Sequence, residues 1–318
     1  MHIGIIYDLK EDYNFRKIES KDFTQLEEVL FLANTLTELG YKIELIHSID
    51  YLKENIKEIK ERCDLVFNLT EGYNSRNREA LVPAFLEMHD IPYVGSDCYA
   101  SNITLDKHLT KLLANDCGIP TPAYSVFLHN NKVFLKELPK SEFVVLKPVY
   151  GGSSDGVMII KQEDTNFFET IKKLSEKYNQ NILIESYASG YDISVSLYGN
   201  IDCGYRIIGA IETLDKNGNK ILLYDSKYKD GYNVIKKVPQ LTSEVKEQIY
   251  SYCNKLALVI KLSGFFRFDF KIDSQKINFL EINTIPSLVQ EGSFLKAISL
   301  NNLDVKDVFG GIVENENV

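Results

Sequence analysis

The chain has 318 residues, enough for two or three domains that each have a core of their own. Its 45 acidic and 36 basic residues give a net charge of −9, which argues against a nucleic-acid-binding protein. It has no run of eighteen apolar residues and no signal-peptide pattern, so we expect a cytoplasmic protein without a membrane segment. Five scattered cysteines without a CxxC pair predict reduced thiols rather than zinc ligands.

The first hundred residues alternate between strand and helix patterns. One helix, capped by Ser20, is expected to carry the apolar side chains from Phe23 to Leu39 and to end at Gly40. A second helical pattern covers 78–90. Short apolar strands are expected at 2–8, 41–46, 64–70 and 91–96. Strands separated by helices in this way predict a mostly parallel sheet, and the lack of G-x-G-x-x-G after the first strand gives no support for a dinucleotide site.

A second unit is expected to begin at residue 104. Thr104 would cap a short helix that Gly118 ends. Strands are then expected at 143–149, 156–161, 181–188 and 191–199, with a helix near 164–178. The rest of the chain predicts strands at 205–212, 265–272 and 276–283 and a helix over 243–262. We therefore divide the chain into domains over 1–103, 104–190 and 191–318.

A glycine-rich stretch, "LKPVYGGSSDGVMII", covers residues 146–160. A P-loop has its lysine after the glycines and a helix next, whereas here Lys147 comes first and a strand former follows. We expect a hairpin between two strands. The backbone amides of residues 151–154 could form an anion nest, but plain turns of this composition are common.

Near the C-terminus, "FRFDFKIDSQKINFLEIN" predicts a hairpin of two alternating strands. Arg267, Asp269 and Lys271 share one face of the first strand. On the return strand Glu281 and Asn283 share a face, with Asp269 across from Glu281. The other face of that strand is expected to hold Leu280 and Ile282.

Two interpretations fit this polar patch. Carboxylate and amide oxygens without His or Cys are the ligands that Mg²⁺ prefers, so Asp269, Glu281 and Asn283 are candidate metal ligands. Alternatively, Arg267 and Lys271 simply neutralise the acids in a surface ladder of paired charges. We favour the metal interpretation, because a partly buried pair of carboxylates needs a cation.

Six motifs in order resemble one family. They are "TLDKHLTK", "VVLKPVYGGSSDG", "ILIESYASGYD", "DSKY", "FFRFDF" and "FLEINTIPS", and the resemblance covers about residues 65–295. Together they resemble the D-alanine–D-alanine ligase branch of the ATP-grasp superfamily. The resemblance implies a Rossmann-like (pre-ATP-grasp) α/β domain over 1–103, then a two-lobed α+β ATP-grasp fold. Its central lobe would be 104–190, and the lobe 191–318 would carry the metal and substrate site. A homodimer is a further expectation from the family.

The same resemblance implies roles in binding ATP. Lys107 and Lys147 would reach the phosphates, Glu185 would accept from the adenine amino group, and the backbone near Ala188 would meet the ring edge. Asp192 would take the ribose hydroxyls. The loop over the phosphates and the remaining nucleotide contact add Gly152, Ser153, Ser154 and Leu280.

The resemblance also implies the reaction, an ATP-dependent ligation of a carboxylate to an amine through an acyl phosphate. Asp269, Glu281 and Asn283 would hold two Mg²⁺ ions, and Arg267 would stabilise the reacting acyl group. Ser153 would sit at the centre of the phosphate-covering loop. Lys227 and Tyr228 would belong to a mobile loop that closes over the site.

The amino-acid-facing part departs from the family pattern. The N-terminal Gly-Gly-x-Ser-x-Glu is missing, where Glu11 or Asp12 could take the place of the lost carboxylate, and "LHGxxGEDG" becomes "FNLTEGYNSRNREA". Ser287 stands where a glycine is usual, and a later serine, Ser293, is shifted by one residue. Other candidate substrate contacts, which could equally be a solvated charged loop, are Glu71, Arg76 and Arg78.

Three functions follow from these observations. The preferred one is a ligase that joins other amino acids, or a related carboxylate and amine, and releases ADP and phosphate. The first alternative is a genuine D-alanine–D-alanine ligase with a divergent N-terminal domain. The second is a non-catalytic nucleotide-binding protein that kept the fold, against which the intact residues between Arg267 and Asn283 speak.

Overall fold

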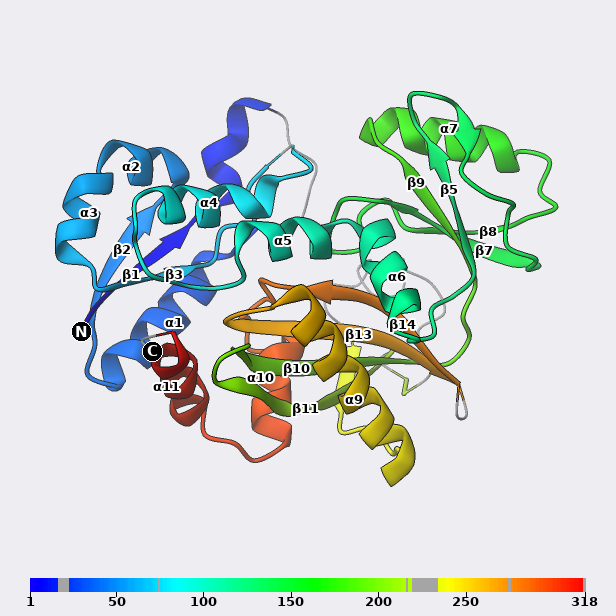
Figure 1. Ribbon diagram of the computed structural model, residues 1–318. Helices are drawn as coiled ribbons and strands as arrows, with labels where there is room; N and C mark the ends of the chain where they lie inside the picture. The colour runs from blue at the N-terminus through cyan, green and yellow to red at the C-terminus, as the bar shows by residue number, and fades with distance from the viewer. Residues whose placement is uncertain (17–22, 74, 216, 219–233, 274–275, 317–318) are drawn as a thin grey trace.

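The computed structural model describes residues 1–16, 23–73, 75–215, 217–218, 234–273 and 276–316. They form a four-stranded sheet with the order β2-β1-β3-β4 and two five-stranded sheets, β6-β5-β9-β7-β8 and β12-β11-β10-β13-β14 (Figure 1). Within these ranges, no helix is long and apolar enough to cross a membrane.

The four-stranded sheet is formed by the N-terminal part of the chain and is parallel throughout, as predicted. Its strands are β1 (His2–Tyr7), β2 (Lys42–His47), β3 (Leu65–Asn68) and β4 (Tyr93–Val94). Successive β1 side chains point to opposite faces. Ile5 packs in the cluster with α1 (Leu26–Glu38), and Ile6 packs in the cluster with the helices of the other face. Those helices are α2 (Ile49–Glu54), α3 (Ile56–Arg62) and α4 (Leu81–Met88).

Helix α1 begins later than the apolar pattern predicts. Its N-cap is Gln25, whose backbone N–H donates a hydrogen bond to the Glu28 carboxylate. The carboxylate at the third helical position therefore stabilises the start of the helix. Ser20, the expected cap, lies outside the described residues. Helices α2 and α3 and the short 3₁₀ segment Lys10–Arg16 were not predicted. The helical pattern over 78–90 corresponds to a 3₁₀ segment, Arg78–Ala80, followed by α4.

A break between α5 (Cys98–Leu105) and α6 (Lys107–Asp116) begins the next part of the chain. Asp106 caps α6, because its carboxylate accepts from the backbone N–H groups of His108 and Leu109, each at 3.0 Å. The prediction of Thr104 as the cap is wrong: its hydroxyl donates to the Ala100 carbonyl inside α5. An aspartate at the break offers a stronger acceptor than a mid-helix threonine.

The middle sheet is antiparallel and carries one helix. Its strands are β5 (Tyr124–Leu128), β6 (Val133–Phe134), β7 (Phe143–Pro148), β8 (Met158–Lys161) and β9 (Ile182–Ser186). Helix α7 (Phe167–Tyr178) packs on it through Phe167, Ile171 and Leu174. Strands β7 and β8 pair antiparallel, which confirms the predicted hairpin around the glycine-rich stretch.

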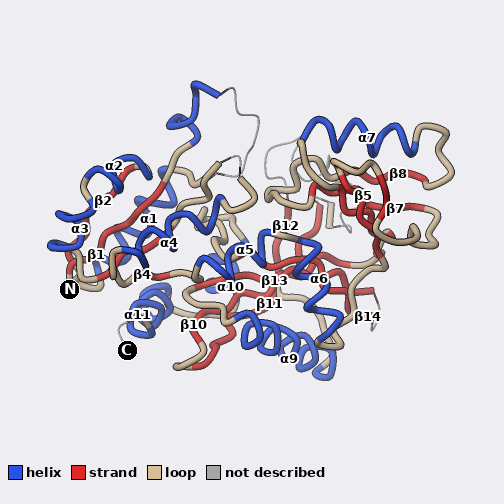
Figure 2. The backbone as a smooth tube through the Cα atoms, turned by 45° about the horizontal axis from the view of Figure 1, so that its top comes forward, coloured by secondary structure: helices blue, strands red, loops and turns tan. Residues whose placement is uncertain are grey.

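The C-terminal sheet is also antiparallel and is covered on both faces. Its strands are β10 (Tyr191–Asn200), β11 (Gly204–Asp215), β12 (Val234–Lys237), β13 (Phe265–Asp273) and β14 (Lys276–Asn283). One face packs on α9 (Ser243–Ile260) through Ile249, Cys253 and Leu256. The other face packs on α10 (Ser293–Leu300). Figure 2 shows α7 and α9 on the outer sides of the two five-stranded sheets.

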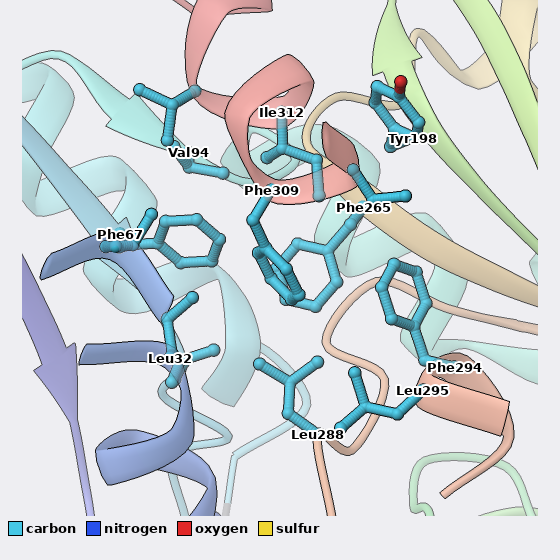
Figure 3. Close-up of a cluster of buried hydrophobic side chains, with 14 of the residues drawn as sticks. Leu32, Phe67, Val94, Tyr198, Phe265, Leu288, Phe294, Leu295, Phe309 and Ile312 are labelled. Atoms are coloured by element: carbon cyan, nitrogen blue, oxygen red, sulfur yellow. The ribbon is translucent and has the colours of Figure 1, made fainter. Parts of the chain in front are cut away.

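The last helix, α11 (Val305–Asn315), returns to the N-terminal sheet. Figure 3 shows Phe309 of α11 among Phe67 of β3, Phe265 of β13 and Phe294 of α10. Its ring centroid lies 6.4, 6.5 and 6.3 Å from theirs. The N-terminal and C-terminal sheets therefore share one core, and the division at residues 103 and 190 stays a prediction.

Replacing Phe309 by alanine tests this shared core. The side chain is fully buried, so Phe309→Ala should lower the free energy of unfolding by about 3 to 5 kcal/mol, measured by urea denaturation. Leu303→Ala, at a 43% exposed position just before α11, should lower it by less than about 0.5 kcal/mol. Equal losses in the two variants would contradict the central place of Phe309.

Candidate active site

One cavity of about 760 Å³ is lined by residues from the middle sheet, the C-terminal sheet and the N-terminal part of the chain. Most of the predicted site residues line it. They are Glu71, Lys107, Lys147, Gly152, Ser153, Ser154, Glu185, Ala188, Asp192, Arg267, Asp269, Leu280, Glu281, Asn283, Ser287 and Ser293. Lys227 and Tyr228 lie outside the described residues.

The polar patch on β13 and β14 has the predicted register, with Asp269 opposite Glu281 and Arg267 opposite Asn283. Arg267 binds Asp269 through two parallel hydrogen bonds, of 2.9 Å from Nε and 2.8 Å from one terminal nitrogen. Asp269 also accepts from the Ser194 hydroxyl at 2.7 Å and from the Asn283 amide at 3.0 Å. These bonds hold the Asp269 carboxylate in one orientation toward the cavity.

A β-bulge changes the expected face of Leu280. The register shifts so that Asp269 pairs with Glu281 but Phe270 pairs with Phe279, which leaves Leu280 as the extra residue. Leu280 therefore lines the cavity, whereas Ile282 packs in the core. The prediction that both lie on the face opposite Glu281 is wrong, because strict alternation does not anticipate a bulge.

The geometry of this patch supports part of the charge-ladder interpretation and part of the metal interpretation. Arg267 neutralises Asp269, as the charge-ladder interpretation expects, while Lys271 pairs with Asp192 at 3.1 Å. Asp269, Glu281 and Asn283 nevertheless line the cavity together and offer only oxygen ligands for a metal. The Asp269 carboxylate has about four lone-pair positions, which are taken by the hydrogen bonds from Arg267, Ser194 and Asn283, so a cation bound there would replace one of these donors. The types of donor atom fit Mg²⁺.

Glu185 is fully buried on β9 between two lysines. Lys147 of β7 lies 2.5 Å from one carboxylate oxygen, and Lys111 of α6 forms an ion pair with the other. Burial alone would raise the pKa of Glu185, but the charges and hydrogen bonds of Lys111 and Lys147 outweigh it and lower that pKa to about 2. Glu185 is therefore a permanent anion at the side of the cavity.

Lys111 is a residue that the sequence analysis missed. It is fully buried, donates a hydrogen bond of 2.6 Å to the Thr121 hydroxyl and lies one helical turn after Lys107. The signal was present in "DKHLTK", where the two lysines are four residues apart and so share a helix face. Lys107 itself lies 3.4 Å from Glu281 and donates to the Gly151 carbonyl.

The tip of the glycine-rich loop has an uncommon backbone. Ser153 and Ser154 have φ angles of 47° and 53°, in the left-handed region that costs a residue with a side chain about 1–2 kcal/mol. A turn bond of 3.0 Å from Asp155 N–H to the Gly152 carbonyl closes this tip. Backbone strain held in place by surrounding contacts is typical of ligand-binding loops.

The amino-acid-facing end contains an acid that was not predicted. Glu28 lines the cavity, and its carboxylate accepts from the Leu288 N–H at 2.7 Å. Burial raises the pKa of Glu28. Neither Glu11 nor Asp12 lines the cavity, and Asp12 pairs instead with His47 at 3.0 Å. The signal for Glu28 was its place in the first turn of α1, next to the apolar residues of that helix that face the core.

The charged loop before α4 supplies Glu71 but not Arg78 to the cavity. Arg78 is buried and lies 3.0 Å from Glu79 and 3.6 Å from Glu71. Arg76 lies over the Tyr150 ring at 5.4 Å from its centroid. The two arginines thus hold the loop that presents Glu71, rather than facing the cavity themselves.

A second group of metal-ligand types lies at the amino ends of β1 and β2, formed by His2, Glu44 and Cys63. Arg62 donates to both oxygens of Glu44, at 2.6 and 3.2 Å. Burial, followed by the charge of Glu44, raises the pKa of the Cys63 thiol to about 11. This group is best described as an ion pair beside a neutral thiol.

Two antiparallel sheets around one cavity, with lysines on one side and a carboxylate–amide cluster on the other, define the ATP-grasp class. The family model for the D-ala D-ala ligase C-terminus matches residues 113–314 of the chain. The chain belongs to the D-alanine–D-alanine ligase family.

Relatives with that name cover most of the chain. The D-alanine–D-alanine ligase of Aquifex aeolicus is 29% identical over 89% of this chain and 92% of its own length. That of Pelagibacter ubique is 32% identical over 86% of this chain and 88% of its own. The crystal structure of the Bacillus anthracis D-alanine–D-alanine ligase matches with a TM-score of 0.75 and 21% identity, over 100% of this chain and 97% of that one.

These findings confirm the predicted fold class and the resemblance. The protein is an ATP-grasp ligase of the class that forms carbon–nitrogen bonds. They favour the first alternative, a D-alanine–D-alanine ligase, over the preferred expectation of other substrates. The roles of the individual site residues stay predictions.

Replacing one of the two lysines that pair with Glu185 tests how much this buried group of charges stabilises the fold. Lys111→Met should lower the free energy of unfolding at pH 7 by about 3 kcal/mol, because it breaks a buried ion pair. Lys132→Met breaks an exposed pair with Glu176, whose side chains are 43% and 62% exposed, and should cost less than about 1 kcal/mol. Similar losses in urea denaturation would contradict the account.

The loss of stability in Lys111→Met should depend on pH if its origin is electrostatic. The folded-state pKa of Glu185, about 2, lies below its ordinary value of 4.5, so its stabilising charge is fully present above pH 4.5. It is lost as the pH falls from there toward 2. The gap in unfolding free energy between the unchanged protein and Lys111→Met should narrow over this range, and a gap independent of pH would indicate lost packing instead.

Proposed function

We propose that this protein joins two molecules of D-alanine, with ATP as the energy source and ADP and phosphate as the other products. The observation that carries this proposal is the gathering of Lys107, Lys147, Arg267, Asp269 and Glu281 around one cavity. The names of the relatives from Aquifex aeolicus and Pelagibacter ubique support the choice of D-alanine over other amino acids.

ATP would bind along the middle sheet. Lys107 and Lys147 line the cavity and are proposed to meet its phosphates, together with the amides of Gly152, Ser153 and Ser154. Glu185, Ala188, Asp192 and Leu280 line the same cavity and are proposed to contact the nucleoside. A solved structure of the Bacillus anthracis ligase complexed with ATP, with a TM-score of 0.73 and 20% identity, supports an ATP site in this fold.

Asp269, Glu281 and Asn283 would hold two Mg²⁺ ions. Bound there, the ions would offset the negative charge of the ATP phosphates, which otherwise face a protein of net charge −9. Arg267 lies on the same face of the sheet, with a terminal nitrogen 2.8 Å from Asp269. It is proposed to stabilise the oxygen of the reacting acyl group.

The proposed reaction needs no side-chain nucleophile. The carboxylate of the first D-alanine attacks the γ-phosphoryl group, which releases ADP and gives an acyl phosphate. The amine of the second D-alanine then attacks the acyl carbon, and phosphate leaves. The chain supplies alignment and charge, and water must be kept out so that the acyl phosphate is not hydrolysed. Lys227 and Tyr228 are proposed to close the site.

The amino acids would lie at the end of the cavity formed by the N-terminal part of the chain. Glu28 and Glu71 supply carboxylates there that can accept from a substrate ammonium group. Ser287, between β14 and α10, and Ser293, the first residue of α10, supply hydroxyls. Arg78 would act through its ion pair with Glu71.

Release of ADP tests the choice of substrate. With ATP and Mg²⁺, D-alanine alone should support turnover, and mass spectrometry should detect the dipeptide. A panel of other D- and L-amino acids, singly and in pairs with D-alanine, should give slower release. Faster turnover with any other pair would contradict the proposal in favour of a ligase for that pair.

Replacing Asp269 tests the proposed metal site. Asp269→Asn removes a negative ligand from the cavity and should lower kcat by at least about 100-fold, measured by ADP release. Asp273→Asn changes an aspartate on the same strand that does not line the cavity and should leave kcat within about twofold. Full activity of Asp269→Asn would contradict the assignment.

A further inference from the structure

The glycine-rich loop is attached at its first end by a side chain outside the cavity. The amide of Gln180 accepts from the Tyr150 N–H at 2.7 Å and donates to the Tyr150 carbonyl at 2.9 Å. The β7–β9 pairing ends at Pro148 and Ile182, and one further backbone bond joins Val149 to Asn181 at 3.1 Å. Gln180 therefore continues the sheet by one more step, with its side chain in place of a backbone.

The second end of the loop is attached to the same region of the fold. The Tyr178 hydroxyl donates to the Asp155 carboxylate at 2.9 Å. Its ring lies against Gly156, where a Cβ atom would come within 2.8 Å of the ring and 2.7 Å of Pro148. Gly156 also has a φ of +73°, so this close approach requires glycine. Tyr178 ends α7, and Gln180 follows two residues later.

The first attachment also reaches Lys107. Tyr150 forms an isolated bridge with Asp106, the cap of α6, and the Lys107 N–H donates to the Val149 carbonyl at 3.2 Å. The Lys107 side chain donates to the Gly151 carbonyl. A shift of the backbone at Tyr150 would therefore move both the start of the loop and one of the two lysines proposed to contact the phosphates.

We infer that Gln180 and Tyr178 are positioning residues that clamp both ends of the glycine-rich loop and so preorganise its amides and Lys107 for the phosphates of ATP. Neither side chain lines the cavity, so each acts through the residues it holds. The inference rests on the proposed ATP site. The end of α7, whose residues do not line the cavity, thus sets the affinity for phosphate groups.

If Gln180 and Tyr178 form this clamp on the two ends of the loop, replacing Gln180 should weaken the binding of ATP but not that of a ligand without phosphate. Gln180→Met keeps the length of the side chain and removes both hydrogen bonds. The dissociation constant of Mg²⁺-ATP, measured by calorimetry, should rise about tenfold, because a small misplacement of binding groups suffices for a loss of this size. The dissociation constant of adenosine, which has no phosphate, should stay within about twofold. A variant that only loosens the fold would weaken both ligands alike.

Two further variants complete the experiment. Gln162→Met changes a half-buried glutamine whose amide contacts the Pro139 and Ser141 carbonyls, at the end of the β7–β8 hairpin opposite the glycine-rich loop. It should leave the affinity for both ligands unchanged. Tyr178→Phe removes only the hydroxyl from the second end. It should raise the ATP dissociation constant by a smaller factor and leave that of adenosine unchanged.

The outcomes separate this inference from the proposed function. If Gln180→Met binds ATP as the unchanged protein does, or loses ATP and adenosine equally, the clamp is overturned while the ATP site stands. If the unchanged protein does not bind Mg²⁺-ATP, the proposed function is overturned together with the clamp. A loss for ATP alone in Gln180→Met, and not in Gln162→Met, supports the clamp.

Discussion

The cavity depends on one buried carboxylate, Glu185. Burying a carboxylate without a cation costs several kcal/mol, so the fold must bring positive charge to this point. It does so from two directions: Lys147 comes from the neighbouring strand β7, and Lys111 comes from α6. Helix α6 packs through Ala114 against the core of the C-terminal sheet, whereas Glu185 belongs to the middle sheet. The ion pair between Lys111 and Glu185 therefore joins the two halves that enclose the cavity.

Helix α6 also connects Glu185 to the residues of the proposed reaction. Lys107 lies one turn before Lys111 and reaches Glu281 on β14 and the Gly151 carbonyl at the start of the loop. Glu281 lies opposite Asp269, which Arg267 and Ser194 hold in place. The cations that would meet ATP and the acids that would meet Mg²⁺ are thus fixed by one connected set of contacts. Preorganised charges of this kind stabilise a transition state without having to rearrange during the reaction.

Local patterns in the sequence predicted most of the fold and the polar patch on β13 and β14, whereas most other cavity-lining residues were expected only from the resemblance to the family. The alternation in "FRFDF" gave the register of β13 and β14, because one face of that sheet is buried and a slip would expose its phenylalanines. The misses have tertiary causes. The bulge at Leu280 belongs to the pairing of two strands and not to either strand alone. Lys111 and Glu28 look like ordinary polar residues of amphipathic helices, and their burial depends on Glu185 and Leu288, which are distant in sequence.

The central claim is that the protein activates a carboxylate as an acyl phosphate, and one isotope measurement tests it directly. D-alanine with ¹⁸O in its carboxyl group is incubated with ATP, Mg²⁺ and the protein, and the released phosphate is analysed by mass spectrometry. The account predicts one ¹⁸O atom in each phosphate formed, because the attacking carboxylate oxygen leaves with the phosphoryl group when the amine forms the amide bond. Phosphate without ¹⁸O, whose fourth oxygen comes from water, would mean that the protein merely hydrolyses ATP. That result would contradict the account.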